Sequence, residues 1–454
     1  MAIGLDQALR QRKGEPAELL IRSAHVLDPR VNLDEPCDIL IRRGHIAELG
    51  AAGSIPSPGR CEVVDAAGRH AFPAFVDPHV HLREPGQEYK EELETGTAAA
   101  AAGGFCAVIA MPNTVPVVDE ASVLRALIDG ARRRARVQVG FLASITRDLR
   151  GDELTEMAEL GDVGALGFTD DGKPVVSAGI LRKALQYQRL CGGVLALHEE
   201  DPALSGDGVM HEGAVSAQLG LAGIPALAES TMVARDAALA QFEGARVHFL
   251  HLSCAGSVQA LEQAKRSGAR VSAEACPHHL TLTDDLVRTL DGRFKMNPPL
   301  RADSDRRAVV GALRSGVLDC VATDHAPHAR HEKEVPFEEA PMGTTGLETA
   351  FAALFTELVL TGELELATLV ARMTAGAAVY DLAVPRIAVG EPANVCVVDL
   401  DAKFEVGADG YASRSANCCF HGRSLYGRVV LTVAGGQVAF RRRALAGARA
   451  PASR

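Results

Sequence analysis

Two histidines separated by one residue, His79 and His81, lie in the segment DPHVHLR after a short apolar run. In an extended chain, residues two apart point to the same side, so both imidazoles can reach one metal ion. Zinc binds imidazole nitrogen at about 2.0–2.1 Å, and a catalytic zinc site needs about three protein ligands. The pair therefore indicates a metal site only if other segments supply the remaining ligands.

Four more residues of ligand type stand at the ends of other strand-like runs: Asp171, His198, His251 and Asp324. Together with the first pair they give four histidines and two aspartates, more than a mononuclear catalytic zinc site uses. The set favours two metal ions that share a bridging carboxylate. Bound metal lowers the pKa of water towards about 7 and polarises a carbonyl or phosphoryl oxygen, so the chemistry predicted is hydrolysis.

Two further polar residues lie close to these candidates in sequence. Arg83 is two residues beyond His81, so its guanidinium should point to the same side, where it can bind a substrate carboxylate. A surface ion pair with Glu84 or Glu88 explains Arg83 equally well. Asn113, in the segment MPNT, has the pattern of a turn or cap residue when judged by position alone.

Apolar runs alternate with stretches of good helix formers through the middle of the chain, which is typical of βα units around a parallel sheet. Eight such runs predict an α/β fold of the TIM (β/α)8 barrel type, whose active sites lie at the carboxyl ends of the strands. A Rossmann sheet is disfavoured because no G-x-G-x-x-G follows the first run. The eight runs are 71–77, 105–111, 137–143, 165–170, 193–198, 246–252, 270–276 and 319–324.

Strand-like sequence also occurs near both ends of the chain, at 18–49, 394–401 and 428–441. Because these segments flank the barrel pattern, we predict a small β-sandwich-like domain built from both ends. Its predicted parts are residues 1–66 and 388–454. The predicted metal-dependent catalytic barrel spans 67–387.

The composition excludes several classes of protein. Lys and Arg total 47 against 58 Asp and Glu, a net charge of −11, whereas nucleic-acid-binding proteins carry a basic face. No segment approaches the roughly 18 apolar residues that span a bilayer, and the first residues lack the apolar region of a secretory signal. The ten cysteines contain no C-x-x-C pair, which disfavours a disulfide framework. We expect a cytoplasmic protein that binds neither nucleic acid nor membrane.

Seven motifs follow one another along the chain: VDPHVHLREPG, MPNT, GFTDDG, LHEED, HLSC, MNPPLR and ATDHAPH. In this order they resemble the cyclic amidohydrolases and, among them, the dihydroorotases of the longer, class I type. HLREPG with MPNT and DHAPH is specific to that type, whereas H-x-H is shared across the superfamily. The resemblance covers nearly the whole chain, including the split β domain.

The resemblance implies a role for each candidate ligand. One Zn²⁺ would be bound by His79, His81 and Asp324, and a second by His198 and His251, with Asp171 bridging the two. Asp171 is favoured over its neighbour Asp170, which strand alternation places on the other face. Hydantoinases and allantoinases typically have a carboxylated lysine at the bridging position, so Asp171 favours the dihydroorotase type. The number of metal ions, one or two, stays open, with two favoured.

The resemblance also implies a set of substrate contacts: His81, Arg83, Asn113, Asn297, His328, Met342 and Gly343. Arg83, Asn113 and His328 would hold the substrate carboxylate, and Met342 and Gly343 would contribute backbone contacts. His278 and His279 end the seventh run, but the family does not use them as ligands, so we assign them a packing role. Cys254 has no activating base beside it in the sequence, and we interpret it as a buried thiol.

The activity implied is reversible hydrolysis of dihydroorotate to N-carbamoyl-L-aspartate in de novo pyrimidine biosynthesis. We expect metal-bound hydroxide to attack the ring carbonyl, while Asp324 takes its proton and delivers it to the leaving nitrogen. One alternative is a hydantoinase or allantoinase, and another is a non-catalytic subunit of an aspartate transcarbamoylase complex. The second is disfavoured because none of the six ligands is missing.

The expected partners are the small-molecule substrate, a second copy of the chain in a homodimer and, as a candidate, aspartate transcarbamoylase. The segment 326–345 is rich in Pro, Glu and Gly and is predicted to be a mobile loop that a partner could order.

Overall fold

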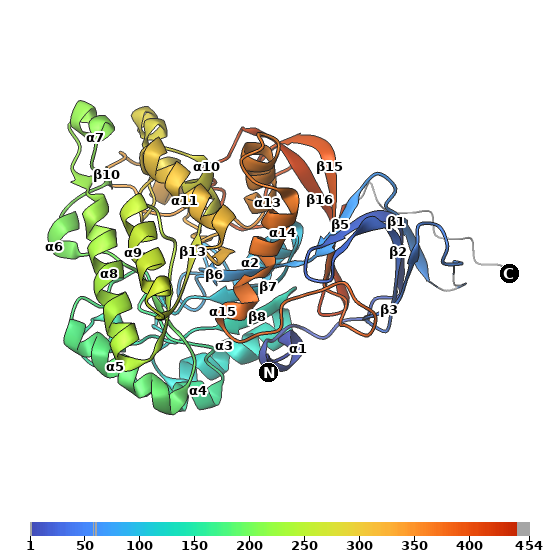
Figure 1. Cartoon of the computed structure of the whole chain (residues 1–454), viewed down its shortest axis with the longest axis horizontal. Helices are drawn as coiled ribbons and strands as arrows, with labels where there is room; N and C mark the ends of the chain where they lie inside the picture. The colour runs from blue at the N-terminus through green and yellow to red at the C-terminus, as the bar shows by residue number, and fades with distance from the viewer. Residues whose placement is uncertain (1, 58, 60, 443–454) are drawn as a thin grey trace.

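The computed structural model describes residues 2–57, 59 and 61–442 of the chain. Figure 1 shows two parts, a barrel surrounded by helices and, beside it, a sheet made of strands from both ends of the chain. The last twelve residues of the predicted β domain, 443–454, lie outside the described residues. No helix in the described part of the chain is long and apolar enough to span a membrane.

Short parallel strands form the barrel wall in two sets. The first set is β6 (Phe75–Val80), β7 (Phe105–Ala110) and β8 (Gln138–Phe141). The second set is β9 (Leu195–Leu197), β12 (Arg246–Phe249), β13 (Arg270–Ala275) and β14 (Cys320–Val321). Nearly every residue of these strands is buried, because one face lines the barrel interior and the other packs under the helices.

Single bridges close the ring between the two sets. Phe168 pairs with Ala143 after β8 and with Leu195 of β9, and His325 pairs with Val80 of β6. The run predicted as a fourth strand, 165–170, is therefore reduced to one paired residue. Closure brings the carboxyl ends of all eight segments to one rim, as the barrel prediction requires.

The helices of the barrel lie outside the strands, as Figure 1 shows. The longer ones are α2 (Leu93–Ala102), α3 (Ala121–Arg134), α5 (Ala178–Cys191), α8 (Ala226–Glu243), α9 (Ala255–Arg266), α11 (Asp303–Ser315) and α14 (Leu366–Thr374). The shorter ones are α1 (Leu5–Ala8), α4 (Met157–Val163), α6 (Pro202–Ser205), α7 (Ala214–Leu219), α10 (Pro277–Thr281), α12 (Arg330–Lys333), α13 (Ala350–Leu354) and α15 (Gly376–Val379). A small parallel pair, β10 (Met210–His211) and β11 (Gly223–Ile224), lies near α7.

The second part is a mixed sheet whose order is β17-β16-β15-β5-β1-β2-β3, with β4 paired to β1. Its N-terminal strands are β1 (Leu19–Asp28), β2 (Leu33–Arg42), β3 (His45–Ala51), β4 (Glu62–Asp65) and β5 (His70–Pro73). Its C-terminal strands are β15 (Val395–Glu405), β16 (Ser424–Ala434) and β17 (Gln437–Arg441). The fold is thus the predicted α/β TIM barrel with a small β domain formed by both termini.

The first predicted strand, 71–77, is divided between the two parts. β5 pairs with β1 and β15 of the terminal sheet and ends at Pro73, which has no N–H to continue the ladder. Ala74 N–H still donates to Asn394 of that sheet, whereas Phe75 N–H donates to Gly104 in the barrel. The change of sheet takes place within two residues, which a pattern of apolar residues alone cannot show.

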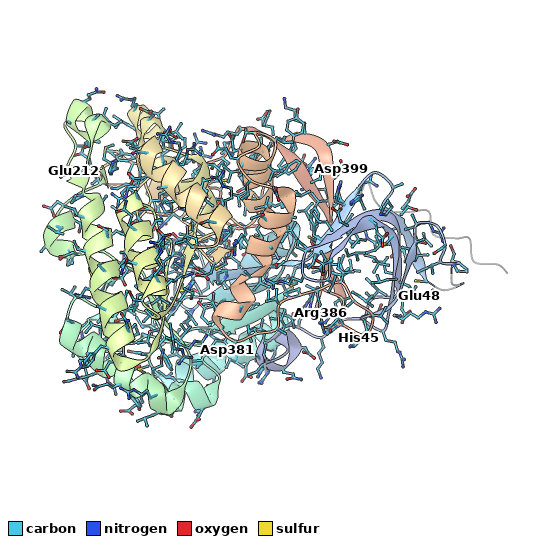
Figure 2. The ribbon with its side chains drawn as sticks, in the orientation of Figure 1. His45, Glu48, Glu212, Asp381, Arg386 and Asp399 are labelled. Carbon is cyan, nitrogen blue, oxygen red and sulfur yellow. The ribbon has the colours of Figure 1, made fainter. Side chains whose placement is uncertain are left out.

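Two ion pairs lie along the return connection from the barrel to the sheet. Asp381 accepts a hydrogen bond from Arg246 at the start of β12, and Arg386 Nε lies 2.9 Å from Glu391 Oε1. Figure 2 places Asp381 and Arg386 along this connection, with His45 and Glu48 farther out on the sheet.

A cluster of aromatic rings joins the two parts. Phe351 of α13 lies 5.6 Å from Phe72 of β5, 5.4 Å from Phe75 of β6 and 5.7 Å from Phe355, measured between ring centroids. All four rings are buried. Offset or tilted aromatic pairs of this kind add to the stabilisation from burial.

Replacing Phe351 with alanine should lower the free energy of unfolding by about 3–5 kcal/mol, because it removes a large buried ring and leaves a cavity. Urea denaturation measures the change. Phe242→Ala is the matched control, since that side chain is 75% exposed. An equal, small loss in both variants would show that the aromatic cluster does not hold the barrel and the sheet together.

Candidate active site

The carboxylate of Asp171 lies between two pairs of imidazoles. Its Oδ2 atom is 3.3 Å from His79 Nε2 and 3.4 Å from His81 Nε2. Its Oδ1 atom is 3.3 Å from His251 Nε2 and 3.4 Å from His198 Nδ1. Each oxygen therefore faces one pair, which is the arrangement of a carboxylate that bridges two cations.

Asp324 completes the group on the side of the first pair. Its Oδ1 atom lies 3.0 Å from His81 Nε2 and 3.5 Å from His79 Nε2. The structure thus brings all six predicted ligands together at the carboxyl rim of the barrel, and all six are buried. They come from the ends of β6, β9, β12 and β14 and from the segment after Phe168.

The donor atoms fit a divalent metal ion. His79 Nε2 is buried and has no hydrogen-bond partner, although it faces carboxylate oxygens of Asp171 and Asp324. His198 Nδ1 and His251 Nε2 point at each other across 3.0 Å. Two sets of three ligand atoms, His79/His81/Asp171 and Asp171/His198/His251, each lie within 4.8 Å of one another. Nitrogen and oxygen donors in this mixture suit zinc and similar ions.

A third carboxylate, Glu274 of β13, orients the first histidine pair from the side away from Asp171. Glu274 Oε1 lies 2.8 Å from His79 Nδ1, and its Oε2 lies 3.0 Å from His248 Nε2. Because His79 donates from Nδ1, its Nε2 lone pair is left free for a metal ion. Glu274 Oε1 also accepts from the backbone N–H of His251 at 3.3 Å. One carboxylate thus fixes ligands on both sides of the site.

The electrostatics of the site favour a cation. Burial opposes ionisation of Asp171, but the surrounding imidazoles, His79 foremost, hold its pKa well below the ordinary value. Burial likewise opposes charge on His198, yet Asp171 and Glu200 raise its pKa to about 9. Glu274 has its pKa lowered to about 2 by His79 and His248 against the effect of burial. Ionised carboxylates at the centre of a buried site attract positive charge.

The neighbouring Asp170 does not face the imidazoles. Its Oδ1 atom accepts from the backbone N–H groups of Ile145 at 2.8 Å and Thr146 at 2.9 Å. It therefore holds the turn after β8, while Asp171 points into the site, as strand alternation predicts.

Three site residues have a left-handed backbone. Arg83 has φ 59°, Asp324 has φ 46° and His251 has φ 33°. A non-glycine residue in this region costs about 1–3 kcal/mol and persists only where its surroundings enforce it. At these positions the strand ends and the chain turns sharply.

A cavity of about 250 Å³ opens beside the imidazoles. Five of the seven predicted substrate contacts line it: His81, Arg83, Asn297, Met342 and Gly343. Arg83 Nε donates to Pro327 O at 3.1 Å, which fixes the side chain along the wall. Asn297 Nδ2 donates to Glu200 Oε2 at 2.6 Å, and Glu200 Oε2 lies 3.3 Å from His198 Nε2.

The other two predicted contacts, Asn113 and His328, support neighbours of the cavity rather than line it. Asn113 Oδ1 lies 2.9 Å from His81 Nδ1, so it orients that imidazole. His328 Nε2 lies 2.9 Å from the carbonyl oxygen of Met342. Gly343 N–H donates to Lys295 O at 2.9 Å, so this backbone group is already used within the protein.

Asn417, which the sequence analysis did not single out, holds the loop 326–345. Its Oδ1 accepts from the backbone N–H of His328 at 3.0 Å, and its Nδ2 donates to Ala326 O at 3.0 Å and Gly343 O at 3.2 Å. Asn417 lies between β15 and β16, inside the range predicted for the small domain, and no local motif marks it. Glu274 was missed as well, although a charge inside the apolar run RVSAEAC was a usable signal.

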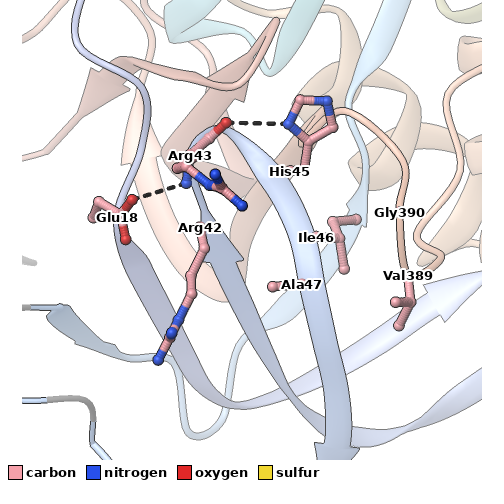
Figure 3. Close-up of a pocket in the computed structure, with 8 residues that line it drawn as sticks. All are labelled: Glu18, Arg42, Arg43, His45, Ile46, Ala47, Val389 and Gly390. Carbon is pink, nitrogen blue, oxygen red and sulfur yellow. Dashed lines mark hydrogen bonds between the residues drawn. The ribbon is translucent and has the colours of Figure 1, made fainter.

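Other candidates do not belong to the ligand cluster. His279 Nε2 is bonded to Pro298 O at 2.8 Å, beside Asn297, and burial raises the pKa of the Cys254 thiol to about 12. A larger hollow of about 900 Å³ lies on the terminal sheet (Figure 3). There Arg43 N–H donates to Glu18 Oε1 at 2.9 Å, and none of the six predicted ligands is present. We therefore take the smaller cavity of the barrel rim as the candidate active site.

Solved structures share this architecture. The L-hydantoinase (dihydropyrimidinase) from Arthrobacter aurescens superposes with a TM-score of 0.83 at 25% identity, covering 94% of this chain and 96% of that one. A dihydropyrimidinase from Brevibacillus agri superposes with a TM-score of 0.80 at 23% identity, covering 93% and 95%. The barrel, its small β domain and the buried His/Asp cluster together define a metal-dependent cyclic amidohydrolase.

Sequence relatives define the group more narrowly. A family model described as Dihydro-orotase-like matches residues 68–257. The dihydroorotase of Pelotomaculum thermopropionicum is 45% identical over 94% of this chain and 100% of its own length. The dihydroorotase of Anaeromyxobacter dehalogenans is 46% identical over 92% of this chain and 97% of its own length. The chain belongs to the dihydroorotase family.

Replacing Glu274 with glutamine should weaken metal binding by about 10–100-fold. The neutral amide lacks the negative charge that keeps the proton of His79 on Nδ1 and its Nε2 free for metal. Metal retained after dialysis against graded chelator measures the effect. Glu159→Gln, at an exposed position of α4, is the matched control. If both variants keep metal as tightly as the unchanged protein, Glu274 does not orient the ligands.

Proposed function

We propose that the protein interconverts dihydroorotate and N-carbamoyl-L-aspartate, a step of pyrimidine biosynthesis, with two zinc ions in the cavity at the barrel rim. The observation that carries the proposal is the Asp171 carboxylate, whose two oxygens face separate imidazole pairs beside the guanidinium of Arg83. Such a site combines hydrolytic chemistry with recognition of a carboxylate. The relatives from Pelotomaculum thermopropionicum and Anaeromyxobacter dehalogenans are dihydroorotases, which supports the proposal.

The six clustered residues would hold the metal ions. His79, His81 and Asp324 would hold one ion and His198 and His251 the other, with Asp171 available to both. Bound zinc supplies a Lewis acid and a water of lowered pKa. Glu274 and Asn113 keep the metal-facing nitrogens of His79 and His81 free by occupying the opposite ring nitrogens.

Asp324 is the proton carrier of the proposed mechanism. Burial opposes its ionisation, but His79 and His81 keep its pKa below the ordinary value, so it is a carboxylate when substrate enters. It lines the cavity, and one of its oxygens contacts His81. In hydrolysis it accepts the proton of the attacking water and delivers it to the leaving amide nitrogen, and in ring closure it works in reverse.

Arg83 and Asn297 would position the substrate. Arg83 is buried at the cavity wall, and its Nε is already bonded to Pro327, so its outer nitrogens are left for the substrate carboxylate. Asn297 Nδ2 is held by Glu200, which leaves its carbonyl oxygen for a ring N–H. Asn113 would orient His81, and His328 would hold the backbone of Met342, so both would affect the substrate indirectly. Met342 and Gly343 would limit the size of the ring that fits the cavity.

Two alternatives lead to different observations. A hydantoinase or allantoinase would act on rings without a carboxylate, and the fold alone is compatible with it. Asp171 in place of a lysine and Arg83 at the cavity favour dihydroorotate. A non-catalytic transcarbamoylase subunit is disfavoured because all six ligand side chains converge. The cytoplasmic location, the homodimer and a transcarbamoylase partner remain predictions.

Elemental analysis of the purified protein, combined with side-by-side assays, tests the proposal. We expect about two zinc ions per chain and turnover of dihydroorotate well above turnover of hydantoin or allantoin. Chelation should abolish activity and added Zn²⁺ should restore it. Bound metal without turnover would indicate that a partner is required, and absence of metal would contradict the mechanism.

Replacing Arg83 with methionine should raise KM for dihydroorotate by about 10–100-fold, because it removes a charge-assisted hydrogen bond to the carboxylate. Zinc content should stay unchanged. Dihydrouracil, which lacks the carboxylate, should be turned over equally by both proteins. Arg133→Met, at an exposed position of α3, is the control. Loss of metal in the Arg83 variant would contradict the assigned role.

A further inference from the structure

A buried lysine lies in the loop that forms one wall of the cavity. Lys333 ends α12, within the segment 326–345, and only 8% of its surface is exposed. The composition of this segment predicts a mobile loop, and no sequence motif marks Lys333. A lysine is almost never buried to this degree unless its ammonium group is satisfied.

The ammonium of Lys333 donates to three backbone carbonyl groups. Its Nζ lies 2.6 Å from Pro341 O, 2.9 Å from Gly292 O and 3.2 Å from Lys295 O. An ammonium has three N–H donors, so all of them are used. The acceptors belong to two segments that are distant in sequence.

Both segments continue directly into the cavity. Pro341 precedes Met342 and Gly343, and Lys295 lies two residues before Asn297. Gly343 N–H donates to the same Lys295 carbonyl at 2.9 Å, so the two segments also contact each other. Lys333 therefore ties together the two walls that carry Asn297, Met342 and Gly343.

No carboxylate forms an ion pair with Lys333 in the described part of the chain. The nearby acids pair with other cations: Glu332 with Lys90 at 3.0 Å, Glu334 with Arg330 at 2.6 Å and Asp291 with Arg293 at 2.9 Å. Burial and the charge of Lys295 lower the pKa of Lys333 to about 7, against smaller opposing effects of Cys419, Asp291 and Glu332. The hydrogen bonds to carbonyl groups are what hold the ammonium.

We propose that Lys333 is a positioning residue for the substrate: its charged form holds the Asn297 wall and the Met342–Gly343 wall at the separation that fits the ring. It touches neither substrate nor metal, so it acts through these walls. A neutral amine has only two N–H donors and a lone pair that faces a carbonyl oxygen, so loss of the proton frees at least one wall. The kinetic test of this role rests on the proposed function, because it uses dihydroorotate as the substrate.

The kinetic test compares Lys333→Met with Lys183→Met, an exposed lysine of α5. Lys333→Met should raise KM for dihydroorotate about tenfold or more, since misplaced walls bind the ring poorly. Its kcat and zinc content should stay within about twofold. KM of the unchanged protein should rise between about pH 6 and about pH 8.5 as Lys333 loses its proton. Lys333→Arg, which stays charged, should show no such rise in KM.

Amide hydrogen exchange of the segment 336–345 tests the same proposal without turnover. After correction for intrinsic rates, protection in the unchanged protein should fall from about pH 6 to about pH 8.5. In Lys333→Met it should be low at both values, while segments on β12 and β13 stay protected. This measurement does not depend on the identity of the substrate. If dihydroorotate is not turned over, the proposed function is overturned, but the exchange data still test whether Lys333 holds the two walls.

Two outcomes would overturn the positioning role. One is equal protection of the segment 336–345 in the unchanged protein and in a folded Lys333→Met variant. The other is a KM that follows the same pH profile in both, which would assign the ionisation to another group. If Lys333→Met does not fold, the pH dependence of amide hydrogen exchange in the unchanged protein tests the positioning role by itself, and protection that does not fall with pH would overturn it.

Discussion

The structure depends on keeping one carboxylate, that of Asp171, charged in a buried position. Removing such a group from water costs several kcal/mol unless opposite charge and hydrogen-bond donors surround it. Cations held by the two imidazole pairs would meet this requirement, and the pairs can reach one point only because the barrel closes and its strand ends converge. Glu274 behind His79, Glu200 beside His198 and Asn113 beside His81 continue the pattern outward. The polar interior is a network in which each member orients the next.

Much of this site could be predicted from the sequence. Side chains at strand ends are constrained by alternation and by the position of the strand in the barrel, so His79, His81, His251 and Asp324 could be identified from local pattern. The family resemblance, together with alternation, separated Asp171 from Asp170, and hydrogen bonds from Ile145 and Thr146 explain why Asp170 points elsewhere. The direction of each of these side chains is set by the strand end that carries it, so the sequence around that strand end is enough to predict it.

The remainder depends on contacts between distant parts of the chain. Asn417 follows β15 in sequence but holds the loop that starts at Ala326, and no motif marks such a pairing. Phe168 is paired through single bridges, so a run that has the pattern of a strand is almost entirely unpaired. The end of β5 at Pro73 and the change of sheet at Ala74 are decided by which carbonyl each N–H meets. The spacing of apolar residues in the sequence does not predict these hydrogen-bond partners.

The left-handed backbone at Arg83, His251 and Asp324 restricts how this site can change over evolutionary time. Glycine adopts that conformation without strain and asparagine, aspartate and histidine at less cost than other residues, whereas β-branched residues clash with their own backbone. Exchanges that keep the barrel intact at His251 and Asp324 are therefore mostly among short nitrogen and oxygen donors. At His251 and Asp324 the main chain thus restricts which residue types can stand there, independently of the metal ion that their side chains would bind.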